Sequence, residues 1–175
     1  RQVVLYGRLR EAIKRINADD GPVDDLTVDR AIRALEATGG QAILEKNRII
    51  TERLIKGVPV ESTEPGAQRQ RWIRFIEFDP AKQDRNDFLA VNQFRVDLPG
   101  RGTFVIPDVV LFVNGLPLVV VECKSPSITD PIGEGLDQLF RYSNNRYWVD
   151  EDEGIEDLFL FNQLMVVSCF YKARL

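Results

Sequence analysis

The sequence predicts an α/β fold in which helices flank a mixed central β-sheet. Up to about residue 60, apolar residues recur with the 3.6-residue period of amphipathic helices. From about residue 70 to 125, the pattern changes to short runs rich in aromatic and β-branched residues, which is typical of strands. A helical pattern and one more apolar run follow. This order of elements favours one mixed sheet covered by helices.

The helices and strands follow from these periods and from the residues that interrupt them. The segment 19–22 (Asp-Asp-Gly-Pro) and the pair Gly39-Gly40 divide the first part of the chain into helices at 3–16, 27–37 and 41–56. After these we expect strands at 71–78 and 88–98, a hairpin of 103–113 with 117–123, helices at 131–146 and 155–161, and a closing strand at 164–171.

These elements predict a single domain over residues 1–175. Its helical part covers 1–60, and its sheet with the associated helices covers 70–175. The chain starts with Arg1 rather than Met and ends soon after an apolar segment. We therefore expect a piece of a longer polypeptide.

The composition excludes several classes of function. The chain has no histidine, which excludes Ser-His-Asp hydrolysis, His-ligated zinc and a histidine general base. A net charge of −4 argues against non-specific coating of nucleic acid but is compatible with a local basic groove. No apolar run approaches the roughly 20 residues of a membrane span, and no secretory signal is evident. We expect a cytoplasmic protein without a membrane partner, in which Cys123 and Cys169 are buried reduced thiols.

Two carboxylates and one amine lie where predicted strands end. Asp108 follows Pro107, and Glu122 and Lys124 close the next apolar run. Because Glu122 and Lys124 are two positions apart, both side chains project from one face of the strand. Such a set suits a Mg²⁺-dependent phosphodiesterase, because Mg²⁺ prefers oxygen ligands, activates water and offsets charge on the phosphate. We predict Asp108, Glu122 and the backbone carbonyl of Cys123 as metal ligands. Lys124 would orient or deprotonate the attacking water and stabilise the transition state.

The same residues are compatible with a simpler structure. A carboxylate in an apolar strand needs a partner, and a Glu122–Lys124 ion pair would also satisfy it. The pattern Glu-x-Lys alone does not distinguish a metal site from such a pair.

Sharing a metal also constrains the hairpin that joins the two strands. A two-residue turn at Asn114-Gly115 would place Asp108 opposite Val121, with its side chain on the wrong face. Asp108 lies opposite Glu122 only if the connection gains a residue. We therefore predict a three-residue loop that includes Leu116, or a β-bulge.

A second group of residues suits contacts to DNA. Gln138 and Tyr142 are one helical turn apart and share a face, so they can hydrogen-bond and stack beside a metal site. Arg141 lies on the same helix and could meet a phosphate. Other arginines that could do so are Arg69, Arg71, Arg74 and Arg146. Structural roles for all of these residues remain an alternative.

Taken together, these motifs resemble a known superfamily. Pro107-Asp108, Glu122-Cys123-Lys124 and Gln138-x-x-x-Tyr142 resemble the motifs of the PD-(D/E)xK nucleases. Three longer stretches, 57–61, 86–94 and 107–118, look like the N-terminal endonuclease domain of type I restriction enzyme R subunits. The similarity covers most of the chain.

The resemblance implies a restriction-endonuclease-like fold and a type I site-specific deoxyribonuclease activity that uses Mg²⁺. It implies cleavage of double-stranded DNA within a restriction-modification complex that also contains methyltransferase and specificity subunits. Cleavage would follow ATP-driven translocation by a helicase-like motor in the same polypeptide. The chain has no Gly-x-x-x-x-Gly-Lys-Ser/Thr phosphate loop, so ATP is expected to bind beyond Leu175.

The chain departs from the superfamily in one respect. The resemblance implies a further acidic residue on the first core helix, which we expect upstream of Arg1. Glu45 and Glu52 are candidate substitutes, but they point away from the apolar face of their helix. Two other functions stay open: a repair or junction-resolving nuclease of the same superfamily, and a non-catalytic DNA-binding scaffold module.

Overall fold

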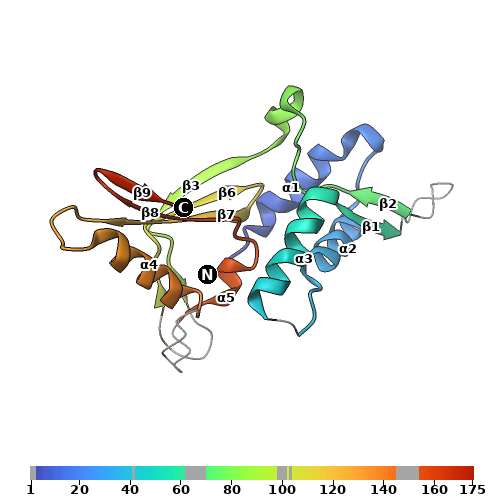
Figure 1. The fold of residues 1–175 in the computed structure, drawn as a ribbon. Helices are drawn as coiled ribbons and strands as arrows, with labels where there is room; N and C mark the ends of the chain where they lie inside the picture. The colour runs from blue at the N-terminus through green and yellow to red at the C-terminus, as the bar shows by residue number, and fades with distance from the viewer. Residues whose placement is uncertain (1–2, 41, 62–69, 98–101, 103, 145–153) are drawn as a thin grey trace. The chain divides into compact units, whose positions relative to one another are not determined.

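The chain forms two compact units. The structure is a computed structural model that describes residues 3–40, 42–61, 70–97, 102, 104–144 and 154–175. The helical unit comprises residues 4–88 and 113–116, and the sheet unit comprises 1–3, 89–112 and 117–175 (Figure 1).

The helical unit is built from helices and one small hairpin. Its elements, among the described residues, are α1 (Tyr6–Ile16), η1 (Ala18–Asp20), α2 (Asp25–Glu36), α3 (Ile43–Lys56), β1 (Val58–Glu61), β2 (Gln70–Ile73) and η2 (Pro80–Arg85). The strands β1 and β2 pair antiparallel. The helix α2 packs against α1, α3 and β1.

Apolar spacing and capping explain the helices. α1 buries Leu9, Ile13 and Ile16, which recur at helical spacing on one face. α2 begins at Asp24, whose carboxylate accepts a 2.6 Å hydrogen bond from the backbone N–H of Thr27. Each helix is therefore fixed by an apolar stripe or a terminal cap that is visible in the sequence.

The sheet unit is organised around a five-stranded mixed sheet. The strand order is β3 (Phe88–Asn92), β6 (Val109–Val113), β7 (Leu116–Lys124), β8 (Leu164–Cys169), β9 (Lys172–Arg174). β7 and β8 are parallel, whereas β8 and β9 form an antiparallel hairpin. A second, two-stranded sheet pairs β4 (Val96–Asp97) with β5 (Phe104–Val105). The strand ends Phe88, Val113 and Leu116 fall within the helical unit.

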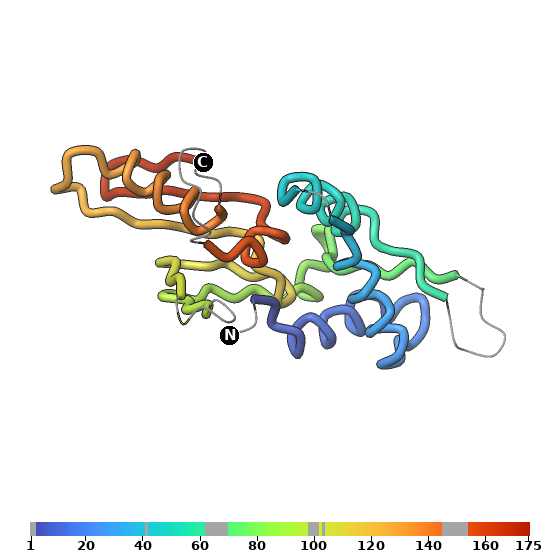
Figure 2. Tube along the Cα trace, turned by 90° about the horizontal axis from the view of Figure 1, so that it is seen from below, coloured from blue at the N-terminus to red at the C-terminus, as the bar shows by residue number. Residues whose placement is uncertain are grey.

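The parallel pair requires a long connection, which contains α4 (Pro131–Tyr142) and α5 (Glu156–Phe159). α4 begins at Asp130, whose carboxylate accepts a 3.0 Å hydrogen bond from the Gly133 N–H, and Pro131 occupies the first helical position. The helix packs on β8 and β9, and Figure 2 shows it lying along these strands. It thereby places its inward side chains over the carboxyl end of β7.

The connection between β6 and β7 differs from the prediction. Leu116 is the first residue of β7, so the turn has two residues, Asn114 and Gly115, and the predicted three-residue loop is wrong. Their φ angles of 55° and 81° are those of a type I′ turn, which matches the twist of a hairpin.

Buried polar contacts hold this turn in the helical unit. Asn114 is fully buried, and its amide donates to the Phe75 carbonyl at 2.8 Å and to the Asn86 side chain at 2.9 Å. Its side-chain oxygen accepts from the Asp87 N–H at 2.7 Å. The carbonyl of Gly115 accepts a 2.9 Å hydrogen bond from the Leu5 N–H.

The prediction of an α/β fold with a mixed central sheet flanked by helices is confirmed, and most element boundaries lie close to those expected. Two strands were missed: β1, which directly follows Gly57 and contains Pro59, and β9, which is short and polar. The predicted strand 88–98 is broken at Gln93, whose φ is 51°. The predicted strand 103–113 is likewise divided into β5 and β6, with 106–108 outside both strands. The predicted strand 71–78 ends at Ile73. No helix in the described ranges is long and apolar enough to cross a membrane.

We predict that Gly115→Ala destabilises the protein by about 2–4 kcal/mol. An added Cβ would meet the Leu5 carbonyl oxygen at 2.5 Å, in addition to the strain of a positive φ. Gly102→Ala is the matched control, since Gly102 also has a positive φ, of 66°, but has open space around it. It should cost only about 1 kcal/mol. Urea unfolding measures both free energies, and equal losses would contradict the role of the Leu5 contact.

Candidate active site

Six of the seven predicted site residues meet at the carboxyl end of β7. Glu122, Cys123 and Lys124 are the last residues of this strand, and Asp108 directly precedes β6, the neighbouring strand. Gln138 and Tyr142 reach the same place from α4. All of these residues belong to the sheet unit.

Glu122 carries a buried carboxylate that is only half satisfied. The residue is 2% exposed. Its Oε1 accepts a 3.1 Å hydrogen bond from Lys124 Nζ, whereas Oε2 is buried and has no hydrogen-bond partner among the described residues. Burial raises the pKa of Glu122, the hydrogen bond from Lys124 lowers it, and the charge of Asp108 raises it further, with a net increase. This oxygen is therefore a site for a cation or a proton.

Lys124 connects this carboxylate to α4. Its ammonium donates to Oε1 of Gln138 as well as to Glu122. The Gln138 amide donates to the Tyr142 hydroxyl at 2.6 Å, and this hydroxyl donates to the Ile106 carbonyl at 3.4 Å. A continuous chain of hydrogen bonds thus runs from the buried carboxylate through the helix to the segment that precedes Asp108.

Asp108 reaches β7 in a way that the register argument did not anticipate. It lies in a bend outside β6, and its Oδ2 accepts a 2.8 Å hydrogen bond from the backbone N–H of Cys123. The carboxylate therefore takes the place of a strand carbonyl beside β7. In an extended strand the N–H and C=O of one residue point to the same side, so the Cys123 carbonyl also faces Asp108. Asp108 does not need to lie opposite Glu122 in the ladder.

Gln93 is a site residue that the sequence argument missed. Its side-chain amide donates to Asp108 Oδ1 at 2.8 Å, and its backbone N–H donates to the Asp108 carbonyl, also at 2.8 Å. Its φ of 51° is uncommon for a residue other than glycine, and such backbone strain is often found at functional sites. A glutamine that ends a strand gave no signal in the sequence, because its left-handed conformation depends on the contact with Asp108.

Close helix packing makes the link from α4 to Lys124 possible. Gly135 is buried, and a Cβ at this position would collide with Val167 Cγ1 of β8. The same Cβ would lie 3.4 Å from Lys124 Cγ. Because Gly135 has no side chain, α4 approaches the sheet closely enough for Gln138, one turn later, to reach the Lys124 ammonium.

The metal-binding capacity of this site rests on two carboxylates. In the described part of the chain, no group of three or more His, Cys, Asp or Glu side chains is placed to hold a metal ion. Mg²⁺ is commonly held by one or two carboxylates, with water and substrate phosphate as its other ligands. Asp108, Glu122 and the Cys123 carbonyl match this type of donor set.

Several other residues have surroundings that differ from the expectation. Both cysteines are free thiols, and Cys169 is buried as predicted. The predicted burial of Cys123 is wrong, because Cys123 is exposed on the face of β7 opposite Glu122 and Lys124. Tyr142 is 6% exposed, which leaves its ring little surface for stacking. Arg141 is exposed, with its Cζ 5.5 Å from the centre of the Tyr142 ring.

The other predicted phosphate-binding or acidic residues have local partners in the helical unit. Arg71 donates to three backbone carbonyls, and Arg74 pairs with Glu77. Glu45 and Glu52 both form ion pairs with Arg48 on the surface of α3. Arg69 and Arg146 lie outside the described residues.

Comparison with known proteins gives the family. The model for the type I restriction enzyme R protein N terminus matches residues 1–175. The chain is 32% identical over 173 residues to the type I restriction enzyme HindI endonuclease subunit of Haemophilus influenzae, which covers 99% of the chain. This chain belongs to the type I restriction enzyme R protein N-terminal family.

Other members of this family are similar to the chain over much of its length. A putative type I restriction enzyme MjaIXP endonuclease subunit of Methanocaldococcus jannaschii is 33% identical over 130 residues, or 72% of the chain. The SsaAORF53P endonuclease subunit of Staphylococcus saprophyticus is 27% identical over 164 residues, or 94% of the chain. The chain spans only 12–15% of the length of these three relatives.

We predict that Gly135→Ala destabilises the folded protein by about 1–3 kcal/mol, although alanine is the better helix former. The new methyl group would push α4 away from Val167. The control is Gly7→Ala in α1, an exposed helical glycine with open space around it, which should be neutral or stabilising. Val167→Ala should restore part of the loss in a double variant. Urea unfolding of all four proteins tests this, and a stabilised Gly135→Ala would contradict it.

Proposed function

We propose that this chain is the nuclease domain of a type I restriction enzyme R subunit, and that it hydrolyses phosphodiester bonds of double-stranded DNA with Mg²⁺ as cofactor. The observation that carries the proposal is the buried Oε2 of Glu122, which lies beside Lys124 and Asp108 and has no hydrogen-bond partner in the described part of the chain. A buried carboxylate oxygen without a donor is costly, and a divalent cation would offset that cost.

The residues present fit Mg²⁺. Glu122 Oε2 has no hydrogen-bond partner among the described residues, the Asp108 oxygens each accept one hydrogen bond from them and retain a lone pair, and the Cys123 carbonyl faces Asp108. When bound, the ion would lower the pKa of water and offset negative charge on the attacked phosphate. Asp108 and Glu122 would hold it, and Gln93 would keep the Asp108 carboxylate in place.

Lys124 supplies the remaining chemistry. Its ammonium is held between Glu122 and Gln138, so it is fixed relative to the carboxylates. From this position Nζ can orient the attacking water and stabilise the charge that develops on the phosphate oxygens. Gln138 acts through Lys124, since its amide oxygen accepts from Nζ while Tyr142 holds the amide from the other side. Arg141, exposed on the same helix, is proposed to contact a DNA phosphate.

The comparisons support this assignment at the level of the family. The relatives carry the names of type I restriction enzyme endonuclease subunits. Their length leaves room for a motor outside this chain. We propose that ATP binds to that motor, that cleavage follows translocation, and that methyltransferase and specificity subunits complete the complex in the cytoplasm.

The first test is Lys124→Ala in the full-length R subunit, assembled with its partner subunits. We expect DNA cleavage to fall by at least about 10²-fold, because a positioned acid–base and electrostatic group is lost. ATP hydrolysis should persist, since Lys124 lies in the nuclease domain. Both activities are measured in the same preparation.

Lys56→Ala is the control, because Lys56 is an exposed lysine on α3. It should leave both activities unchanged. If Lys124→Ala cleaves DNA at the wild-type rate, the ion pair with Glu122 is structural, and a non-catalytic scaffold becomes the better description of the domain.

A second test uses the raised pKa of Glu122. A proton and a metal ion compete for this carboxylate, so Mg²⁺ affinity should increase with pH above the ordinary value of 4.5 and level off once the raised pKa is passed. Isothermal titration calorimetry across this range measures the effect. Glu122→Gln, which cannot ionise, should bind Mg²⁺ weakly and lose this part of the pH dependence. A wild-type affinity that does not change with pH argues against Glu122 as a ligand.

A further inference from the structure

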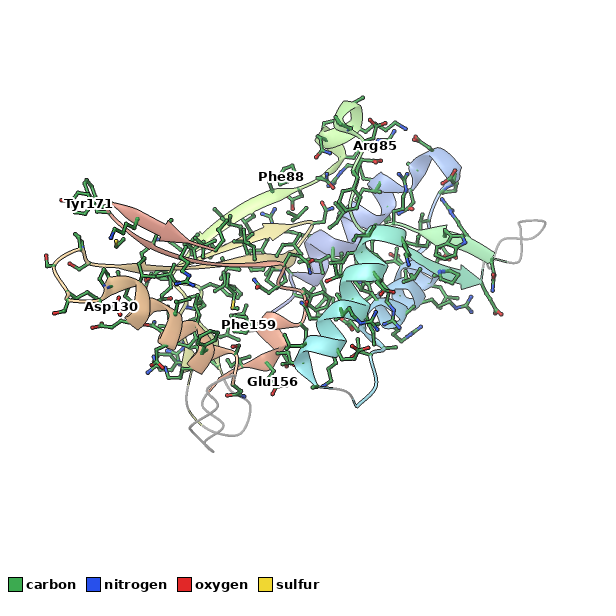
Figure 3. All side chains as sticks on the ribbon, in the orientation of Figure 1. Arg85, Phe88, Asp130, Glu156, Phe159 and Tyr171 are labelled. Atoms are coloured by element: carbon green, nitrogen blue, oxygen red, sulfur yellow. The ribbon has the colours of Figure 1, made fainter. Side chains whose placement is uncertain are left out.

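The tip of the β8–β9 hairpin carries two exposed aromatic residues. Phe170 and Tyr171 are 83% and 78% exposed, and their rings meet edge to face with centres 5.1 Å apart. Figure 3 shows Tyr171 at the outer end of this hairpin. Two-residue hairpin turns favour glycine, asparagine and aspartate, and neither aromatic residue adopts a positive φ. The turn conformation therefore does not require aromatic residues here, and exposed apolar groups that lie together mark interaction sites.

The strand register places this tip next to the candidate active site. Lys124 is paired with Cys169, the residue immediately before the turn. Cys169 is in turn paired with Lys172, the residue immediately after it. The aromatic turn therefore lies at the same end of the sheet as Lys124, one strand away.

The register also places two basic residues on the same face of the sheet as the site. Paired residues on neighbouring strands project from one face. One row contains Lys124, Cys169 and Lys172, and the next contains Glu122, Val167 and Arg174. Lys172 and Arg174 are both exposed, and neither makes an ion pair with another described residue. Among the described residues β9 is the last strand in the sheet order, so these two cations form a basic edge beside α4, which packs on β8 and β9.

The distance between β7 and β9 suits contacts to one strand of a DNA duplex. Two strand spacings separate β9 from β7, which is roughly 9–10 Å. Successive phosphates on one strand of B-DNA advance by about 3.4 Å along the axis. Because the strand also winds around that axis, neighbouring phosphates lie roughly 7 Å apart through space, so a duplex with one phosphate at Lys124 would present another, one or two nucleotides away, to Lys172 or Arg174.

We propose that the β8–β9 hairpin is a DNA-contacting edge of the nuclease site. Lys172 and Arg174 bind phosphates of the duplex, and Phe170 and Tyr171 enter a groove and pack against sugars and base edges, as apolar wedges do in minor-groove binding. This rests on the proposed function, since it takes the duplex to be the substrate held at Lys124. Another part of the long R subunit is the competing occupant of the tip.

A photo-crosslinking experiment identifies the occupant. The full-length subunit, assembled with its partners, carries a photoreactive phenylalanine analogue in place of Tyr171. A matched control carries it in place of Leu44, which is 72% exposed on α3. We expect crosslinks to double-stranded DNA from position 171 and none from position 44. Crosslinks only to protein, or no crosslinks, overturn the proposal.

A charge variant tests the basic edge. Lys172→Gln/Arg174→Gln should slow DNA cleavage by the same complex without affecting ATP hydrolysis. Each lost phosphate contact lowers by about 0.9 the slope of the logarithm of DNA affinity against the logarithm of salt concentration. The ratio of the wild-type to the variant cleavage rate at limiting enzyme should therefore shrink about tenfold between about 50 and 200 mM salt. Arg33→Gln/Lys56→Gln, which removes two exposed cations of the helical unit, should have no effect. A salt-independent ratio, or an equal effect of the control, overturns the proposal.

These outcomes separate this inference from the proposed function. If Lys124→Ala still cleaves DNA while position 171 crosslinks to DNA, the nuclease assignment fails and the DNA-binding edge remains. If Lys124→Ala abolishes cleavage while position 171 crosslinks only to protein, the nuclease site remains and the edge is overturned.

Discussion

The burial of one carboxylate is the constraint on which the rest of the site depends. Glu122 is buried, and Lys124 is its one cationic partner among the described residues, so its charge must be balanced by groups that the fold holds in place. Breaking a buried ion pair by removing one partner typically costs several kcal/mol. Lys124 is accordingly held from two sides, by Glu122 and by Gln138 of α4.

Much of this arrangement could be predicted from the sequence, because it depends on local signals. The apolar stripe of α1, the Asp24 cap of α2 and the Asp130-Pro131 start of α4 each act within a few residues. Glu122 and Lys124 share a face because of strand geometry alone. The pairing of Gln138 with Tyr142 likewise follows from one helical turn.

The rest depends on contacts that are distant in the sequence. The break at Gln93 is tied to Asp108, 15 residues later, so alternation alone predicted one strand through it. The register argument assumed that Asp108 belongs to a strand, whereas its carboxylate binds the Cys123 N–H from outside β6. The edge strand β9 lacks an apolar pattern because all three of its residues are exposed.

The hydrogen-bond chain through α4 also has a direction. Gln138 accepts a hydrogen bond from Lys124 with its amide oxygen and donates one to Tyr142 with its amide nitrogen. The Tyr142 hydroxyl in turn donates a hydrogen bond to the Ile106 carbonyl. A neutral amide takes up no proton at ordinary pH, so this chain cannot carry one away from Lys124. Proton transfer to or from Lys124 can therefore involve only Glu122 and any molecule bound on that side. On its other side, Lys124 faces α4, which offers no path for a proton.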